Sequence, residues 1–252
     1  MSSYHEDCRP RNWQEIVGQD ATVNRIKSLI SRSWGGRAYW ISGASGTGKT
    51  SIARLIAAEN ADVMYTEETI ARDLSVSEYD RITRGHNFAP MIGMGHCVIV
   101  NEVHGMTKGI RERLLGELDP VRENVCWIFT TTNIAQASLF EDDTNGDNAA
   151  LLSRCTAIKL VDNAASRLAM ATRAKEMAMR DGLDGQPLEI YIAALSARNG
   201  SMRALLGDVE CGRITELAQE RDGIQRSLDM LKSTKGESAE EKRAELRRQL
   251  GR

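Results

Sequence analysis

Hydrophobic residues in the first 160 positions occur either in short continuous runs or at helical spacing. The short runs cover residues 38–42, 62–65, 97–101, 125–131 and 156–160. Runs of this kind, without polar alternation, are typical of strands in a parallel sheet that is covered on both faces. Between them, apolar residues at helical spacing predict helices over 19–33, 50–60 and 107–118. Strands separated by helices predict right-handed crossovers and a doubly wound α/β sheet.

The strand pattern stops after about Val161. Residues 164–180, 187–197 and 201–220 all have the spacing of helices, and Gly182, Gly185 and Gly200 separate them. We therefore expect an α/β domain over residues 1–161 and a small all-helical domain over 162–231. Residues 232–252 are rich in charge and poor in large apolar side chains, which predicts a solvated helix or a frayed tail.

The overall charge is close to neutral, with 33 Lys and Arg against 35 Asp and Glu and a net charge of -2. This excludes binding to nucleic acid through bulk charge, so any DNA contact must come from a local face. The five cysteines form no CxxC pair, and we expect buried thiols and no zinc. The sequence has no apolar run near the ~18 residues of a membrane span. No membrane partner is expected, and the expected compartment is the cytoplasm.

A glycine-rich segment follows the first predicted strand and precedes a predicted helix. It has the pattern GxxxxGK[ST], in which glycines let backbone N–H groups surround phosphates at a helix N-terminus. Lys49 is placed for the β- and γ-phosphates and the Thr50 hydroxyl for Mg²⁺. The residues expected to bind the nucleotide here are Gly43, Ala44, Ser45, Gly46, Thr47, Gly48, Lys49, Thr50 and Ser51.

The apolar strand at 97–101 ends in Asn101-Glu102, where such sites usually carry Asp-Glu. Glu102 is expected to polarise the attacking water. Asn101 takes the metal-side position, and its neutral oxygen should hold Mg²⁺ less well than a carboxylate. Two interpretations remain open. Either Thr50, the phosphates and water complete the metal shell and the site turns over, or the site binds ATP and hydrolyses it slowly or not at all.

A polar residue, Asn133, follows the strand at 125–131. We expect that strand to lie beside the Glu102 strand, so that Asn133 reaches the γ-phosphate or orients the attacking water. The alternative is a loop residue that caps the next helix.

Six further segments resemble one family in their order. They are Arg9-Pro10 with Trp13-Gln14-Glu15-Ile16-Val17-Gly18-Gln19, Phe88-Ala89-Pro90, Asn101-Glu102-Val103-His104, Glu117-Leu118-Asp119-Pro120, Leu152-Ser153-Arg154-Cys155 and Asn199-Gly200-Ser201-Met202-Arg203. With the glycine-rich segment, they resemble AAA+ ATPases, and specifically DNA polymerase clamp loader subunits of the bacterial gamma/tau type. Ser153-Arg154-Cys155 is the most specific of these matches.

The resemblance implies a P-loop AAA+ parallel sheet with helices on both faces, followed by a helical lid domain, with ATP and Mg²⁺ as cofactors. It implies that Arg154 is an arginine finger for ATP on a neighbouring subunit, and that Arg203 touches the γ-phosphate of its own ATP. It also implies that Ile16 and Val17 line the adenine pocket. From the residues alone, Arg154 could instead be a surface arginine, and Arg203 could pair with an acid of the helical domain.

The sequence departs from gamma/tau subunits in two places. Residues 57–84 contain no cysteine, so the zinc module of that type is absent. Only residues 221–252 follow the lid, too few for the collar domain through which such subunits assemble. The resemblance therefore indicates a reduced clamp loader subunit that relies on AAA+ contacts or on a partner's collar.

The expected function is to couple ATP binding and hydrolysis to the loading of a sliding clamp on primed DNA. The expected partners are other subunits in a homo- or hetero-oligomer, a pentamer by resemblance, together with the clamp and the DNA. Candidate DNA phosphate contacts are Lys108, Arg111, Arg81 and Arg84, although solvated helix charges explain them equally well. The alternatives are a structural subunit that binds but does not hydrolyse ATP, and a related motor such as a Holliday-junction branch-migration ATPase.

Overall fold

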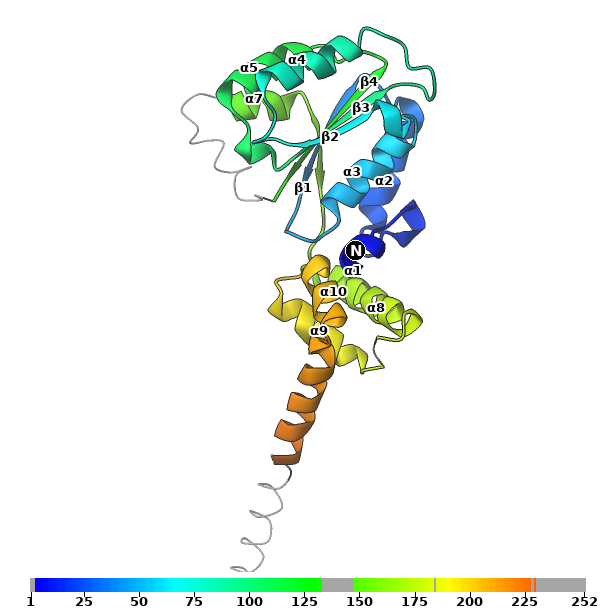
Figure 1. Cartoon of the computed structure of the whole chain (residues 1–252), viewed down its shortest axis with the longest axis vertical. Helices are drawn as coiled ribbons and strands as arrows, with labels where there is room; N and C mark the ends of the chain where they lie inside the picture. Colours follow the sequence, from blue (N-terminus) through cyan, green and yellow to red (C-terminus); the bar gives the residue numbers. More distant parts are fainter. Residues whose placement is uncertain (1–2, 133–146, 184, 228, 230–252) are drawn as a thin grey trace, which may run out of the picture.

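The computed structural model describes residues 3–132, 147–183, 185–227 and 229. Five parallel strands form one sheet in the order β2-β3-β4-β1-β5 (Figure 1). The strands are β1 (Arg37–Ser42), β2 (Thr66–Ile70), β3 (His96–Asn101), β4 (Val125–Thr131) and β5 (Thr156–Lys159). The expected α/β class with a parallel sheet is confirmed, and β1 lies between β4 and β5.

Helices cover both faces of this sheet. One face packs against α2 (Asp20–Arg32) and α3 (Lys49–Ala58), and the other against α4 (Val76–Gly85), α5 (Lys108–Glu117) and α7 (Asp147–Ser153). Successive residues of β4 alternate between the two cores, so that Ile128 faces α3 while Trp127 and Phe129 face α5. All seven residues of β4 are buried, which explains why its sequence is an uninterrupted apolar run.

The prediction of a strand over residues 62–65 is wrong. Those residues form a 3₁₀ turn, η2 (Val63–Tyr65), whose first N–H groups are capped when the Asp62 carboxylate accepts from the Met64 N–H at 2.9 Å. The strand β2 begins directly afterwards, at Thr66, and has the polar sequence TEETI. It lies at the edge of the sheet, where little apolar burial is needed, and so it lacks the apolar signal of the inner strands.

The C-terminal part of the described chain is helical, as expected. It contains α8 (Ala164–Arg180), α9 (Leu188–Ala197) and α10 (Met202–Glu210), and residues 213–227 form a further helix that points away from the sheet domain (Figure 1). The single helix predicted over 201–220 is interrupted by a turn at 211–212, because Gly212 adopts a φ of 77° that cannot continue a helix. The predicted tail at 232–252 lies outside the described residues.

Residues 4–8 pack against the C-terminal helices rather than against the sheet. These helices, over residues 164–227, are called the lid below. The Tyr4 hydroxyl, at the start of α1 (Tyr4–Asp7), donates to an Asp181 carboxylate oxygen at 2.9 Å, and Cys8 is buried in the lid core. The domain boundary at 161/162 stays a prediction. The chain therefore passes between the two parts twice, once after Cys8 and once after Val161.

The passage after Val161 is held by a side chain of the passage after Cys8, that of Gln19. The Gln19 amide donates to the Val161 carbonyl at 2.7 Å and accepts from the Val161 N–H at 2.9 Å. At Gly18, whose φ is 70°, a Cβ atom would lie 2.8 Å from the Cα of Ser166 in α8. The backbone thus approaches the first lid helix more closely than any side chain would allow. Among the described residues, no helix is both long enough and apolar enough to cross a membrane.

Candidate nucleotide-binding site

The glycine-rich loop connects the carboxyl end of β1 to the first residue of α3. Gly46 and Gly48 have φ angles of 78° and 96°, and Gly48 is the N-cap of α3. These left-handed conformations favour glycine, and they turn the loop so that it ends on a helix N-terminus with unpaired N–H groups. The local sequence therefore builds a site whose backbone donors suit an anionic phosphate group.

The lid reaches this loop directly. A Cβ atom at Gly46 would lie 2.3 Å from the Ser201 hydroxyl and 2.8 Å from the Ser201 Cα, immediately before α10. The absence of a side chain at Gly46 thus lets the lid and the phosphate loop touch. A pocket lies between them and is lined by residues of both parts.

Lys49 is buried at the base of the loop. Its Nζ donates to the Gly43 and Ala44 carbonyls at 2.9 and 2.8 Å. Burial lowers the pKa of Lys49 to about 8; Glu102 opposes this shift and Arg203 adds to it. Within the described part of the chain this buried ammonium pairs only with loop carbonyls and has no anionic partner, and a triphosphate would supply one. The residues present therefore fit ATP.

We expect ATP affinity and stability to respond to pH in opposite directions. Above about pH 8 the Lys49 ammonium is lost, and ATP affinity should fall by up to about tenfold per pH unit. The unfolded chain keeps that proton up to its ordinary pKa of 10.5, so the nucleotide-free protein should gain stability between these values. Nucleotide titrations and thermal unfolding from pH 7 to 10 measure both trends.

The Lys49→Met variant is the control, because it removes the titrating group. Its stability should lack the part of the pH dependence that Lys49 causes, and it should bind ATP weakly at every pH. A parent protein whose ATP affinity stays constant from pH 7 to 10 would contradict this role of Lys49.

The Thr50 hydroxyl meets the end of β3. It donates to the Asn101 Oδ1 at 3.3 Å, and this oxygen also accepts from the Thr130 hydroxyl at 2.8 Å. The other end of the amide donates to Glu68 on β2 at 2.9 Å. Mg²⁺ prefers oxygen ligands, so Thr50 and Asn101 together fit the ion. When bound, Mg²⁺ would neutralise charge on the phosphate oxygens.

Glu102 lies one residue beyond β3 and faces the pocket. Its φ of 54° is unusual for a residue other than glycine and turns the side chain out of the strand direction. A carboxylate oxygen accepts from the Thr132 hydroxyl at 3.1 Å and lies 3.5 Å from the His104 Nδ1. The sequence did not single out Thr132, although its place at the end of β4 was a signal. Asn133 lies outside the described residues.

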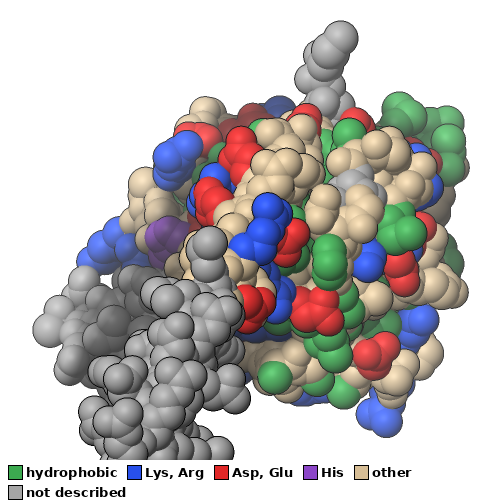
Figure 2. Space-filling view, turned by 90° about the horizontal axis from the view of Figure 1, so that it is seen from below, with side chains coloured by type: hydrophobic (Ala, Val, Ile, Leu, Met, Phe, Trp, Pro, Cys, Tyr) green, Lys and Arg blue, Asp and Glu red, His purple; other side chains and the backbone are tan. Residues whose placement is uncertain are grey.

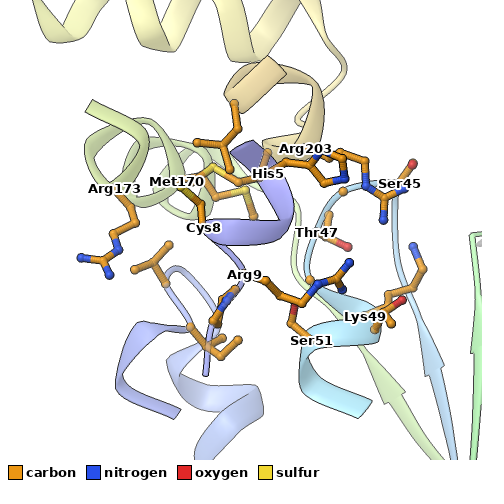
Figure 3. A pocket seen from close by; sticks show the side chains of 18 of the residues that line it. His5, Cys8, Arg9, Ser45, Thr47, Lys49, Ser51, Met170, Arg173 and Arg203 are labelled. Atoms are coloured by element: carbon orange, nitrogen blue, oxygen red, sulfur yellow. The ribbon is translucent and has the colours of Figure 1, made fainter. Parts of the chain in front are cut away.

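The pocket continues from the loop into an apolar region. Ile16 and Val17 line it, and Ser51 lines it near Lys49. That Ile16 and Val17 contact adenine stays a prediction. The lid and the segment after α1 add sulfur-containing and aliphatic side chains that the sequence did not point to: Cys8, Met170, Met177, Met202 and Leu206. Cys8 and Met170 belong to the same core cluster and appear close together in Figure 3, to the left of the phosphate loop. The sequence could not predict that these side chains line the pocket, because their position depends on how the lid packs against the sheet domain.

Basic side chains surround the phosphate end of the pocket. Arg203, in the first turn of α10, lines it close to Ser45, and Arg9 points into it (Figure 3). The ion pairs among the described residues do not include Arg203. The Asp208 carboxylate on the same helix is instead paired with Arg198 at 2.7 Å. This arrangement favours Arg203 as a ligand of the nucleotide over the alternative of an acid-paired arginine.

Arg154 does not line the pocket of its own chain. It follows α7, where its guanidinium donates to the Ala150 carbonyl at 2.9 Å and pairs with Asp119 at 3.2 Å. Its side chain is 32% exposed. The structure thus separates Arg154 from Lys49, Glu102 and Arg203, a separation that a finger acting on a neighbouring subunit requires.

The candidate DNA contacts lie on α4 and α5, away from the pocket. Lys108 lies 3.7 Å from Glu112, Arg81 pairs with Glu67 and Glu78 at 2.9 and 2.7 Å, and Arg84 donates to the Asp80 carbonyl. Arg111 lies on the same helix as Lys108. The face in Figure 2, at the lid end of the molecule, carries both signs of charge interspersed. The role of these four residues stays a prediction.

Comparison with known proteins finds similarity to a family of ATPases and to two kinds of protein that act on DNA or in its replication. The sequence model of the ATPase family associated with various cellular activities (AAA) matches residues 39–142. The tau subunit of DNA polymerase III from Bacillus subtilis is 26% identical over 147 residues, which cover 49% of this chain and 26% of that subunit. The gamma subunit from Buchnera aphidicola is 25% identical over 248 residues, 88% of this chain and 64% of the relative.

A second kind of protein is also similar. The Holliday junction branch migration complex subunit RuvB from Mycoplasma pneumoniae is 29% identical over 120 residues, 46% of this chain and 37% of that subunit. A solved structure of RuvB from Thermotoga maritima, described as a Holliday junction branch migration motor, has a TM-score of 0.59 at 16% identity. It matches over 81% of this chain and 64% of the solved one.

The chain spans about a quarter of the length of the tau subunit it matches. The family model covers the glycine-rich loop and the strands β2 to β4, and the likeness to the solved RuvB structures concerns the fold over 81% of this chain. The chain therefore contains an AAA ATPase domain with the AAA+ fold.

Proposed function

We propose that the chain is an ATP-hydrolysing subunit of a clamp loader, acting in the cytoplasm on primed DNA. The loop N–H groups and Lys49 bind the phosphates, and Arg203 adds a donor from the lid. Glu102 accepts a proton from the attacking water. Arg154 of one subunit stabilises charge that develops at the ATP of its neighbour. The lid, in contact with the loop at Gly46, senses occupancy of the site.

The observation that carries this proposal is the extent of the similarity to the gamma subunit. That alignment runs over 88% of this chain, whereas the alignment with RuvB covers 46%. The clamp loader proposal is also supported by the segment Leu152-Ser153-Arg154-Cys155, which resembles the clamp loader motif and lies outside the pocket. The likeness to solved RuvB structures, at about 15% identity, concerns the fold that both classes share.

Two other functions have an observation in their favour. The sequence similarity to the RuvB subunit, 29% identical over 120 residues, favours a motor that acts on Holliday junctions. Asn101 at the metal side favours a structural subunit that binds ATP and lends Arg154 to a neighbour without turning over itself. Glu102 lines the pocket, which argues against a structural subunit, because a site that does not hydrolyse ATP has no need of a residue that activates water.

Steady-state ATP hydrolysis by the full chain with different DNA cofactors tests the proposal. We expect primed DNA to raise turnover several-fold, and a four-way junction to have no more effect than a duplex of equal length. Native mass spectrometry with ATP should show a pentamer, alone or completed by partner subunits. Preferential stimulation by the junction, with a hexamer, would instead identify a motor. Bound ATP without turnover under every condition would identify the structural subunit.

A further inference from the structure

Hydrogen bonds connect α3, the edge strand β2 and the phosphate loop in one continuous series. The Arg54 guanidinium donates to both Glu68 carboxylate oxygens, at 2.7 and 3.2 Å. The Asn101 amide nitrogen donates to Glu68 at 2.9 Å, and the Asn101 oxygen accepts from Thr50 and Thr130. Glu68 therefore contacts the residue at the metal side of the site without entering the pocket itself.

Glu68 determines the orientation of the Asn101 side-chain amide, that is, which side its oxygen and its NH₂ group point to. A carboxylate only accepts hydrogen bonds, so the amide NH₂ must point toward Glu68 and the amide oxygen toward Thr50. The hydroxyls of Thr50 and Thr130 can donate or accept, so they alone would tolerate either orientation. Mg²⁺ needs the oxygen, since the lone pair of an amide nitrogen is delocalised into the carbonyl group and does not bind a hard cation. The Arg54 pair in turn fixes the carboxylate in one geometry.

The same contact explains why asparagine suits this position. An aspartate in its place would bring a second carboxylate to about 2.9 Å from Glu68, and two like charges at that distance cannot both stay ionised without cost. Arg54 and Glu68 are 46% and 29% exposed, so their ion pair alone adds little stability. What it contributes is orientation.

We propose that Glu68 is a positioning residue for the metal side of the nucleotide site. Held by Arg54, it aims the oxygen of Asn101 at Thr50 and at the Mg²⁺ position, so that Glu68 and Asn101 together replace the usual acid at the end of this strand. The inference rests on the proposed binding of Mg²⁺ and ATP at this site. It assigns a role to a residue of an edge strand that no motif contains.

Binding of a fluorescent ATP analogue, titrated with Mg²⁺, tests the pairing without any need for turnover. In Glu68→Gln we expect the Mg²⁺ concentration for half-maximal binding to rise about tenfold, because the new amide no longer fixes the orientation of Asn101. Glu67→Gln is the matched control. Glu67 is the preceding residue of the same strand and pairs with Arg81, so its variant should behave like the parent.

The double variant Glu68→Gln/Asn101→Asp reverses the two partners. The amide introduced at 68 can donate to the carboxylate introduced at 101, so the hydrogen bond is kept with its direction exchanged. Asn101→Asp alone should weaken Mg²⁺-dependent binding and lower the unfolding temperature of the nucleotide-free protein in EDTA. The double variant should recover most of both losses.

Two results would overturn the proposal: Asn101→Asp alone binding Mg²⁺ and the analogue as tightly as the parent, or Glu68→Gln behaving like Glu67→Gln. Failure of the function is a different result, namely a folded parent that binds no analogue at any Mg²⁺ concentration. In that case the unfolding temperatures still test the pairing. Recovery in the double variant would support it, and additive losses would contradict it.

Discussion

Replacing Arg154 with alanine is expected to lower ATP turnover by about 10³-fold or more, because an arginine finger is worth about 10³–10⁵ in turnover. ATP binding by the isolated chain should not change, since Arg154 does not line its own pocket. Turnover is measured at saturating ATP, and affinity by titration. Arg154→Lys should not rescue activity, because the planar fork of the guanidinium is lost.

A matched control is Arg113→Ala. Arg113 is also partly exposed and pairs with a carboxylate, that of Asp80, at 2.9 Å, but it lies on α5 and its partner on α4. Its loss should leave turnover close to that of the parent. If both variants lose activity equally, the effect of Arg154→Ala reflects general surface charge rather than a finger.

Mixing two inactive variants separates action within a chain from action between chains. An Arg154→Ala subunit keeps Glu102, and a Glu102→Gln subunit keeps Arg154. In a random head-to-tail ring of the two, about one site in four receives both groups. We expect the mixture to recover turnover in about that proportion. A mixture as inactive as its parts would contradict transfer of the arginine between copies of this chain.

Glu102→Gln should lower turnover by about 10²–10⁴-fold, the range for loss of a general base, while ATP stays bound. The Glu102 carboxylate faces the pocket and accepts a hydrogen bond from Thr132, so glutamine fits the space without its proton-accepting function. Removal of a negative charge near the triphosphate should leave affinity equal or higher. Single-turnover hydrolysis and equilibrium binding distinguish the two effects.

Glu112→Gln provides the control for that variant. Glu112 lies on α5, is 58% exposed and pairs with Lys108 at 3.7 Å. Its variant should keep full turnover. Equal loss in both variants would show that the effect of Glu102→Gln reflects the removal of acidic charge in general and not the loss of a specific proton acceptor.

The inner strands of the sheet were predicted correctly from the sequence because strands buried on both faces consist of continuous apolar residues. The inner strands β1, β3 and β4 are covered on both faces, so their apolar runs are unambiguous. The edge strand β2 has no apolar run, and the apolar residues before it are exposed: Val63 is 88% exposed and Met64 79%. The helix α4 was not predicted, because only Tyr79 and Ile82 of its ten residues are buried.

The site divides in a similar way. Backbone conformation and the glycine-rich motif are local, so the loop from Gly43 to Thr50 was identified by pattern alone. Contacts between distant segments carry no pattern. Glu68 and Asn101 are 33 positions apart, and the approach of Ser201 to Gly46 joins two domains. Only the folded chain brings such pairs together.

The two passages of the chain between the sheet domain and the lid restrict how the lid can turn. Because two hydrogen bonds join Gln19 to Val161, we expect the lid to rotate about the line through both passages more easily than it twists. The helix over residues 213–227 is about 22 Å long at 1.5 Å per residue, so a lid rotation of about 10° would move its far end by about 4 Å. With such a rotation the helix would act as a lever arm, which converts a small displacement beside the phosphates into a larger one at its far end.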